Sequence, residues 1–543
     1  MDLKTTLKKK IQSFVKDRQA LSALPLAEIL CELNPNDNES HFLKTKAHFE
    51  AREYENVINA VSFALRVDRE NVEFITLGMK AAFEIGELKQ SVKFANSLIE
   101  LDKENICAIC YIAKCSELCG DTVEAVRYYK IALEKDPFCG EALMSMVKRK
   151  LLTPKEISDF IDTLRFPPEA EIIKKCYKAK LNITNMDSDW SQDLPPNLAL
   201  LQKVRREYER NNLHKALLLI SNFLERDPYD RDAVCLYLCT LIDMNATPKL
   251  FEEAHFLTKN KSRSELAVYA IGCYYYSLSN FERAGRYFCR ATELDCYFAE
   301  AWVAYGHCYS KLEEGEQALD VYRRAMNFFP GLTECLTFSG MQYSRIHQWP
   351  IAVCFFEESL KKSPNNPLVL NEMGVVFVRN GNLQEALKFF YQAYNNLPNK
   401  ENPSERQDCI LFNLATILRK LGEYNEAIKY YTQYVKCRPG AGHAHCALGF
   451  TYHLLGNLKV AIMHYHRVLS IKLDSFCRGL LDRALSTDSG RNISGLMKDK
   501  EGANPTSQGK VSFSMISKTF RSVSSAESVL RTPKSSVERS LSF

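Results

Sequence analysis

The chain has 543 residues, of which 46% are hydrophobic and 25% charged, and its formal net charge is +5 at pH 7. A charge this small for the length does not indicate nucleic-acid binding, which usually requires a clustered basic surface. No apolar run is long enough to span a bilayer, and the N-terminus lacks the apolar core of a signal peptide. We therefore expect a soluble intracellular protein that binds neither nucleic acid nor membrane.

The 19 cysteines favour neither a disulfide framework nor a metal site. Disulfide frameworks are typical of small secreted domains, whereas these cysteines are spread through the helical segments of a long chain. Cys107, Cys110, Cys115 and Cys119 begin with a zinc-like spacing, but they fall on one predicted helix. The ends of that helix lie about 18 Å apart, so four sulfurs cannot meet one ion at about 2.3 Å. We expect no metal and no cofactor, and cysteines that serve as small packing residues.

Repeats begin in the first third of the chain. Pro35 and Pro137 occupy equivalent positions and lie three periods of 34 residues apart. Weaker copies of one pattern lie between them: REYENVINAVSFALRVD, GELKQSVKFANSLIELD and GDTVEAVRYYKIALEKDP. These copies predict an N-terminal array of helical hairpins over residues 1–139.

Residues 140–196 interrupt this phase and form the predicted irregular helical connection. Thr153 and Glu156 have the spacing of a capping box, with Pro154 at the first helical position. The segment TNMDSDWSQDLPPN has the composition of a loop. A further repeat ends at Pro228, and residues 242–262 are again irregular, with a helix expected through LFEEAHFLT.

The strongest pattern lies in the middle of the chain. Gly272, Gly306, Gly340 and Gly374 lie 34 residues apart, and each is followed after 12 residues by Ala and after 16 by Tyr or Phe. This spacing is typical of the tetratricopeptide repeat, in which each unit is a pair of antiparallel helices. One such repeat cannot bury its own apolar face, so the units must stack into a superhelical solenoid.

Small residues at fixed positions indicate close packing of the two helices in each repeat. In the clearest copy, we expect Gly306 and Ala318 to let the helix backbones approach, with Tyr309 and Tyr322 filling the space around them. Pro330 ends the second helix because proline cannot continue it. The residues to which we assign repeat packing are Gly272, Trp302, Gly306, Ala318, Gly340, Gly374 and Gly449.

The register continues to about residue 475, which gives about twelve units and a C-terminal array over 197–475. Residues 485–543 are rich in Ser, Gly, Lys and Arg and poor in apolar side chains, so we predict a disordered tail. Within this tail, Thr532 precedes a proline and is a candidate site for a proline-directed kinase. Phosphorylation there would add a charge of about −1.5 to −2.

We find no motif of a catalytic site, so the protein is expected to act through its surfaces and not as an enzyme. In tetratricopeptide solenoids the first helix of each repeat lines a groove that binds peptides. Aromatic and dispersed polar residues at groove positions suit a specific peptide partner. The candidate partner-binding residues are Tyr269, Tyr276, Glu300, His307, Asn371, Arg379, Phe412 and Arg419.

Several segments, in this order, resemble one family of tetratricopeptide subunits of the anaphase-promoting complex (cyclosome), the cell division cycle protein 16 homologues. They are MDLKTTLKKKIQSFVKDRQALSALPLAEIL, PFCGEALMSMVKRKLLTPKEISDFIDTL, AVYAIGCYYYSLSNFERAGRYFCRATELDCYFAEAWVAYGHCYS, NEMGVVFVRNG and LGFTYHLLGNLKVAIMHYHRVL. The resemblance implies a non-catalytic scaffold in a ubiquitin ligase of mitosis, present in nucleus and cytoplasm. It also implies a homodimer formed through the N-terminal repeats, and a C-terminal groove that binds other subunits, including the N-terminus of a very small one.

Two other classes of function remain open from the residues alone. The first is a tetratricopeptide adaptor that binds peptides in another multiprotein assembly, and the second is an enzyme. A stable homodimer in a very large particle favours the scaffold, a monomer that binds short peptides favours the adaptor, and turnover of a substrate favours the enzyme.

Overall fold

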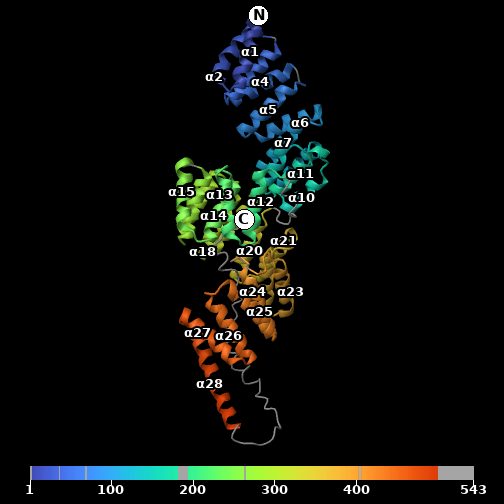
Figure 1. The fold of residues 1–543 in the computed structure, drawn as a ribbon. Coiled ribbons are helices and arrows are strands. Elements are labelled where there is room, and N and C mark those ends of the chain that lie inside the picture. Colours follow the sequence, from blue (N-terminus) through green and yellow to red (C-terminus); the bar gives the residue numbers. More distant parts are fainter. Residues whose placement is uncertain are drawn as a thin grey trace. The chain divides into compact units, whose positions relative to one another are not determined.

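The computed structural model describes residues 3–35, 37–67, 70–181, 194–261, 264–401, 403–404 and 407–498. These residues form 28 α-helices and one short 3-10 helix, with no strand among them (Figure 1). The chain divides into two compact units, one of Met1–Leu194 with Phe329–Gly331 and one of Pro195–Phe328 with Leu332–Phe543. The predicted all-α solenoid of helical hairpins is confirmed.

The first unit consists of four helical hairpins followed by shorter helices. Each odd-numbered helix from α1 to α7 packs against the helix that follows it. The helices of this unit are α1 (Leu3–Lys16), α2 (Ala20–Leu33), α3 (Asn38–Glu50), α4 (Tyr54–Val67), α5 (Val72–Ile85), α6 (Leu88–Leu101), α7 (Ile106–Leu118), α8 (Thr122–Lys135), α9 (Gly140–Lys148), α10 (Pro154–Thr163), η1 (Pro168–Ala170) and α11 (Glu171–Lys180).

The break in the repeat phase after residue 139 is visible as a change in helix length. Helices α9 and α10 have 9 and 10 residues, whereas the hairpin helices before them have 13 or 14. The predicted capping box is present: the Glu156 amide donates to Thr153 Oγ1 at 3.3 Å, and the Thr153 amide donates to Glu156 Oε2 at 2.8 Å. Most of the predicted loop at 184–197 lies outside the described residues, and Pro196 begins the next helix.

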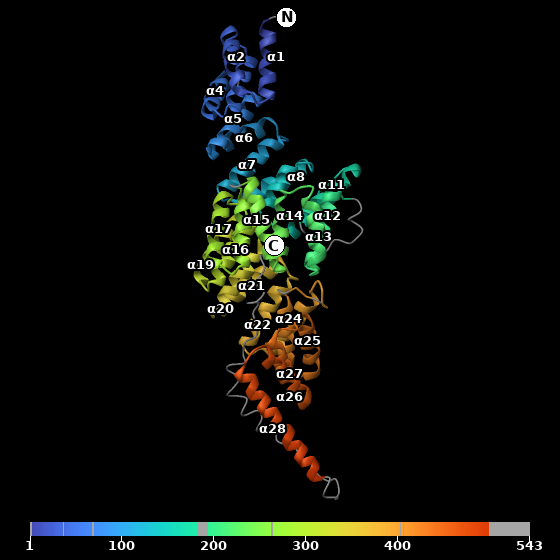
Figure 2. The same cartoon turned by 60° about the vertical axis from the view of Figure 1, so that its left-hand side comes forward.

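The second unit contains eight hairpins and a closing helix, so the described residues form twelve hairpins of the repeat length. Figure 2 shows the same helices from a second direction. The helix expected through LFEEAHFLT is α15. The helices of this unit are α12 (Pro196–Glu209), α13 (Leu213–Leu224), α14 (Arg231–Asp243), α15 (Thr247–Lys261), α16 (Glu265–Ser277), α17 (Phe281–Leu294), α18 (Ala299–Lys311), α19 (Gly315–Phe328), α20 (Thr333–Arg345), α21 (Trp349–Lys362), α22 (Pro367–Arg379), α23 (Leu383–Asn395), α24 (Asp408–Leu421), α25 (Tyr424–Cys437), α26 (Gly442–Leu455), α27 (Leu458–Ile471) and α28 (Ser475–Lys498).

The two helices of a hairpin differ in how they are buried. In α22 nine of 13 residues are buried, whereas in its partner α23 only three of 13 are buried. Second helices such as α23 have one apolar stripe, which is typical of a helix that packs on one side only. The first helices also contact each other from hairpin to hairpin, as α20, α22, α24 and α26 do in turn. The first helices therefore form the inner layer of the unit.

The repeat glycines pack against aromatic rings. A Cβ added at Gly272 would lie 2.6 Å from the ring of Phe288, and one added at Gly374 would lie 2.8 Å from the ring of Phe390. Gly306, Gly340 and Gly449 have the same relationship, each to the aromatic residue 16 positions later: Tyr322, Phe356 and Tyr465. The expectation that these glycines let two backbones approach is therefore wrong in its physical detail, because it is a ring that needs the space.

The other two residues assigned to repeat packing lie in the hairpin core. Ala318 is fully buried on α19. Trp302 is 8% exposed, donates its Nε1–H to the Cys296 carbonyl at 3.0 Å and packs beside Phe328. Tyr309 behaves differently from the expectation, because its ring packs beside Tyr305 and not around Gly306.

The C-terminal end differs from the sequence-based prediction. Helix α28 runs from Ser475 to Lys498, so residues 485–498 continue a helix where a disordered tail was predicted. Cys477, Leu480 and Ala484 bury the start of α28 against the last hairpin, which explains why the helix forms. Residues 499–543, with the candidate phosphorylation site Thr532, lie outside the described residues.

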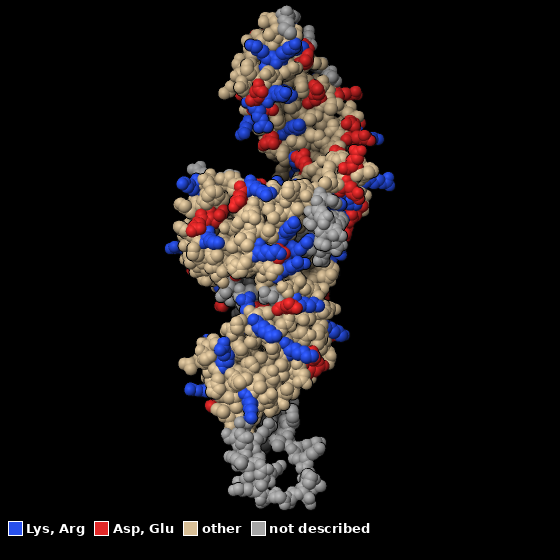
Figure 3. Space-filling view, in the orientation of Figure 1, with Lys and Arg blue, Asp and Glu red and all other residues tan. Residues whose placement is uncertain are grey.

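Charged side chains of both signs lie on the surface of the described residues. Lys and Arg are mixed with Asp and Glu in both units on the face that Figure 3 shows. Within the described part of the chain, no helix combines the length and apolar character needed to cross a bilayer. The same residues contain no group of three His, Cys, Asp or Glu placed to hold a metal ion.

Candidate partner-binding site on the inner helices

Polar side chains are buried along the inner layer of the second unit, where apolar ones would be expected. On α18 and α20, Ser310 Oγ accepts hydrogen bonds from Gln342 Nε2 at 2.6 Å and from an Arg345 guanidinium nitrogen at 2.7 Å. Gln342 is 4% exposed and Ser310 5% exposed. These bonds join the first helices of two successive hairpins.

The same arrangement continues on α22 and α24. Asn371 Nδ2 donates to Glu372 Oε1 at 3.1 Å, and Asn413 Nδ2 donates to Asn371 Oδ1 at 3.0 Å. All three side chains are fully buried or nearly so. We call the whole set the polar ladder: Ser310, Gln342, Arg345, Asn371, Glu372 and Asn413.

The carboxyl group of Glu372 is the most perturbed member of the polar ladder. Burial raises its pKa to about 8, although the hydrogen bond from Asn371 and the charge of Arg345 act in the opposite direction. A carboxyl group with this pKa is mostly protonated at neutral pH, so it can donate as well as accept a hydrogen bond. With the two amides it forms a hydrogen-bonded network that is buried in the packing between successive hairpins.

Two predicted partner-binding residues, Tyr269 and Tyr276 on α16, are core residues. Tyr269 is 0% exposed, and its ring lies 5.4 Å from that of Phe288 and 4.9 Å from that of Phe298. Tyr276 is 2% exposed and packs beside Phe281. The position-based assignment fails here because these large rings fill space between adjacent hairpins.

His307 on α18 is likewise buried. Its Nδ1 lies 2.8 Å from the Tyr322 hydroxyl, and its ring is 4.5 Å from that of Phe338. The structure therefore contradicts its assignment as an accessible groove residue and places it inside the packing between two hairpins.

The C-terminal candidates lie close to one another in the inner layer. Asn371 belongs to the polar ladder, and Phe412 on the neighbouring α24 packs against Tyr431, with ring centroids 5.5 Å apart. Arg419, half-buried on α24, places its guanidinium group 5.0 Å from the centre of the Phe450 ring. Asn371 and Phe412 are buried, so of these three only the half-buried Arg419 reaches the surface.

The two remaining candidates lie at helix ends. Glu300 is half-buried in the first turn of α18. Arg379 is exposed at the last position of α22, with its guanidinium group 5.5 Å from the centre of the Trp349 ring. Neither residue is within the polar ladder.

Sequence reasoning missed Gln342, Arg345, Glu372 and Asn413. A signal for part of the polar ladder was present, because Asn371 and Glu372 are the only polar residues in the run LVLNEMGVVFV. A polar pair in the middle of an otherwise apolar helix indicates a buried hydrogen-bond network.

Comparisons with known proteins agree with this fold. Models of the tetratricopeptide repeat match residues 269–331, 367–440 and 412–472. The anaphase-promoting complex subunit 6 of Arabidopsis thaliana is 30% identical over 380 residues, which are 66% of this chain and 70% of that protein. The chain belongs to the anaphase-promoting complex subunit 6 family.

Two further proteins of known name are also similar to this chain of the subunit 6 family. The cell division cycle protein 16 homolog of Mus musculus is 28% identical over 389 residues, 68% of this chain and 63% of the relative, so less than two thirds of the mouse protein is spanned. A solved structure of the APC/C hetero-tetramer Cut9-Hcn1 matches with a TM-score of 0.70 and 22% identity, over 89% of this chain and 97% of that one. At this identity the structural match shows the fold alone.

Proposed function

We propose that this protein is a non-catalytic scaffold subunit of an anaphase-promoting complex, and that it supports ubiquitination by holding other subunits in place. The observation that carries this proposal is the 30% identity to the Arabidopsis subunit 6 over 380 residues. Scaffolding also suits the architecture, because a solenoid of hairpins offers long surfaces for partners.

A finer part of the proposal concerns a small partner. We propose that the inner helices α18 to α26 bind an extended segment of a very small subunit, with the accessible Arg379 and Arg419 in the contact. One feature supports this: Cut9 is described in one assembly with a second protein, Hcn1.

We also propose that the chain forms a homodimer through residues 1–139. The assembly of Cut9 with Hcn1 is described as a hetero-tetramer of two named proteins, which is compatible with two copies of each. The first unit exposes large apolar side chains: Leu21 is 88% exposed, Val123 79% and Phe63 66%. Covering these side chains in a dimer would remove their apolar surface from water, which is favourable.

The proposal is tested by isolating the affinity-tagged full chain from its own cells and identifying what co-purifies by mass spectrometry. We expect a very large particle that contains other subunits of the ligase. Recovery of the chain without them would contradict the scaffold proposal and favour a peptide-binding adaptor in another assembly. Fluorescence imaging of the tagged chain tests the proposed distribution over nucleus and cytoplasm.

Two variants, each with a matched control, test small-subunit binding and homodimer formation separately. R379A/R419A removes two cationic side chains of the inner helices and is expected to lose only the small subunit, whereas N327A, at an exposed position on α19, should lose none. L21D/F63D is expected to be monomeric by light scattering, whereas L218D, at a 69% exposed position of the second unit, should stay dimeric. If the variant of the inner helices keeps its small subunit, the proposed binding of that subunit is wrong. If L21D/F63D keeps the mass of a dimer, the proposed dimer interface is wrong.

A further inference from the structure

Two cysteine side chains of the first unit are in contact at the end of its fourth hairpin. The Cys110 sulfur lies 3.6 Å from the Cys139 sulfur. Cys110 is on α7 and Cys139 immediately precedes α9, so all of α8 lies between them in the sequence. An S–S bond is about 2.05 Å long, so the sulfurs need to approach by about 1.6 Å to form one.

Other contacts hold the start of α9 beside α7. Lys114 on α7 forms an ion pair with Glu141 in the first turn of α9. Ala142 and Leu143 of α9 are buried in the same apolar cluster as Cys110. Because both an ion pair and core packing fix these two segments, the two sulfurs stay within reach of each other.

The two thiols differ in access and in acidity. Cys110 is 2% exposed, whereas Cys139 is half-buried. The contact with Cys110, with help from the Ala142 amide, lowers the pKa of Cys139 to about 7, and the same contact together with burial raises the pKa of Cys110. The thiolate is the form that reacts with an oxidant. An oxidant from solution therefore meets the more reactive sulfur first.

The position of Cys139 is a helix-capping position in the preceding repeats. Asp37, Asn71 and Asn105 precede it at successive intervals of 34 residues, and each accepts a hydrogen bond from a backbone amide at the start of its helix. Asp and Asn are among the residues preferred there, and cysteine is not. Packing explains the buried Cys110, but neither packing nor capping explains a half-buried cysteine at this position.

We propose that Cys110 and Cys139 form a reversible disulfide when hydrogen peroxide oxidises the chain, with Cys139 reacting first. The Cys139 thiolate attacks one oxygen of the peroxide, the O–O bond breaks, and a sulfenic acid and hydroxide form. The Cys110 sulfur then attacks the Cys139 sulfur, the S–O bond breaks, and the thiol proton leaves with the oxygen as water. Two electrons pass from the two sulfurs to the peroxide, and a dithiol reductant reverses the change.

The bond would tie α9 to α7. It would close a loop that contains α8, and closing a loop restricts the unfolded chain. Helix α9 is the first of the shorter helices that follow the four hairpins. The oxidised chain should therefore open locally less often where the hairpins end. This inference does not depend on the proposed scaffold function, because it concerns only the chain itself.

The test uses the full reduced chain, which is treated with hydrogen peroxide, alkylated and digested without reductant. We expect mass spectrometry to find the peptides of Cys110 and Cys139 joined, and dithiothreitol to separate them. At neutral pH the Cys139 thiol should be lost at least about tenfold faster than that of Cys176, whose pKa is raised by burial. Absence of the joined peptides after the Cys139 thiol has been lost would overturn the proposal.

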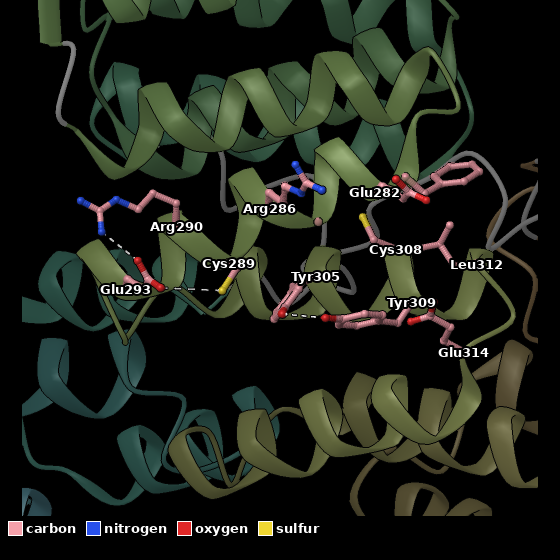
Figure 4. A pocket seen from close by; sticks show the side chains of 12 residues that line it. Glu282, Arg286, Cys289, Arg290, Glu293, Tyr305, Cys308, Tyr309, Leu312 and Glu314 are labelled. Carbon is pink, nitrogen blue, oxygen red and sulfur yellow. Dashed lines mark hydrogen bonds and ion pairs between the residues drawn. The ribbon is translucent and has the colours of Figure 1, made fainter.

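A second pair of cysteines supplies the matched control. Cys308 is 1% exposed and Cys289 is half-buried, and both line one pocket between α17 and α18. The Cys289 sulfur lies 4.0 Å from Glu293 Oε1, and Figure 4 shows it well apart from the Cys308 sulfur. This pair has the burial of Cys110 and Cys139 without their contact, so it should not become joined. Equal joining of both pairs would show that the contact does not select the pair, and would contradict the proposal.

Two variants separate the roles of the thiols. In C110A, checked for folding by circular dichroism, the sulfenic acid on Cys139 should accumulate at about pH 8 and be trapped by dimedone. Trapping no greater than in the native chain would show that Cys110 does not take part. C139S should fold, because serine is a preferred capping residue, and should give no joined peptide.

Hydrogen exchange measures the effect of the bond on α9. Its amides should exchange at least about tenfold more slowly in the oxidised native chain than in the reduced chain. In C139S, peroxide should leave their exchange unchanged. Equal exchange in the oxidised and reduced native chains would show that the bond does not tie α9 to α7.

Discussion

The ring of His307 on α18 is fixed by the hydroxyl group of Tyr322 on α19, at a distance of 2.8 Å between Nδ1 and the oxygen, and both side chains are 0% exposed. Tyr322 is the aromatic residue whose ring takes the space left by Gly306. The Tyr322 side chain therefore completes the packing of its own hairpin at Gly306 and also forms a hydrogen bond with the buried imidazole of His307. The same relationship occurs between Tyr431 and Thr416, whose oxygens lie 2.8 Å apart.

We expect Y322F to destabilise this hairpin by about 1–3 kcal/mol, because it leaves a buried imidazole nitrogen without that hydrogen bond. Hydrogen exchange of the amides in α18 and α19 is the preferred measurement, since a solenoid can unfold locally. H307L/Y322F removes both polar partners and should recover part of the loss. Equal exchange rates in the native chain and in Y322F would show that the bond contributes nothing.

Much of the fold could be predicted because spacing and side-chain size decide it locally. The period from Gly272 to Gly374 and the alanines between them specify the hairpins and their order. The start of the tail was placed too early because composition alone does not show that α28 packs on the last hairpin.

The candidate site was harder to predict, because it depends on which way each side chain is buried. Tyr269 and His307 occupy groove positions by count, but neighbouring hairpins cover them completely. Glu372 was missed because its role depends on burial, on the hydrogen bond from Asn371 and on the charge of Arg345 on α20, which the repeat pattern does not report.

Glycine at the ring-facing position is expected to be essential for stability. G340A would bring a methyl group to 2.5 Å from the ring of Phe356, which is closer than the side chains can accept without moving. We expect a loss of about 1–3 kcal/mol from this overpacking, measured by chemical denaturation. The matched control is G479A in α28, where nothing lies within 4 Å of an added Cβ. Ala has the higher helix propensity, so G479A should be neutral or slightly stabilising.

Glu372 is expected to make stability fall with rising pH. Its pKa in the folded chain is about 8, above that of an unfolded Glu, so the native state keeps a proton that the unfolded state has lost. Its contribution to stability is complete below about pH 4 and is lost as the pH rises to about 8. E372Q removes this titration, so the native chain should lose stability relative to E372Q between pH 5 and pH 8. Melting temperatures measured at both pH values check this, and parallel changes in the two proteins would contradict it.

Cys139 is expected to be the more reactive member of a close thiol pair. Its Sγ lies 3.6 Å from that of Cys110, and this contact, with help from the Ala142 amide, lowers the pKa of Cys139 to about 7. Burial raises the pKa of Cys176, another half-buried cysteine. Since the thiolate is the reactive form, iodoacetamide at pH 7 should label Cys139 at least about tenfold faster than Cys176.

Timed alkylation from pH 6 to pH 9, read by peptide mass spectrometry, measures this difference directly. In C110A the contact that lowers the pKa is gone, so the midpoint of Cys139 labelling should move to higher pH. The midpoint of Cys176 should not move, because Cys110 is not among the groups that shift its pKa. A midpoint of Cys139 that is the same in the native chain and in C110A would show that the neighbouring thiol does not activate it.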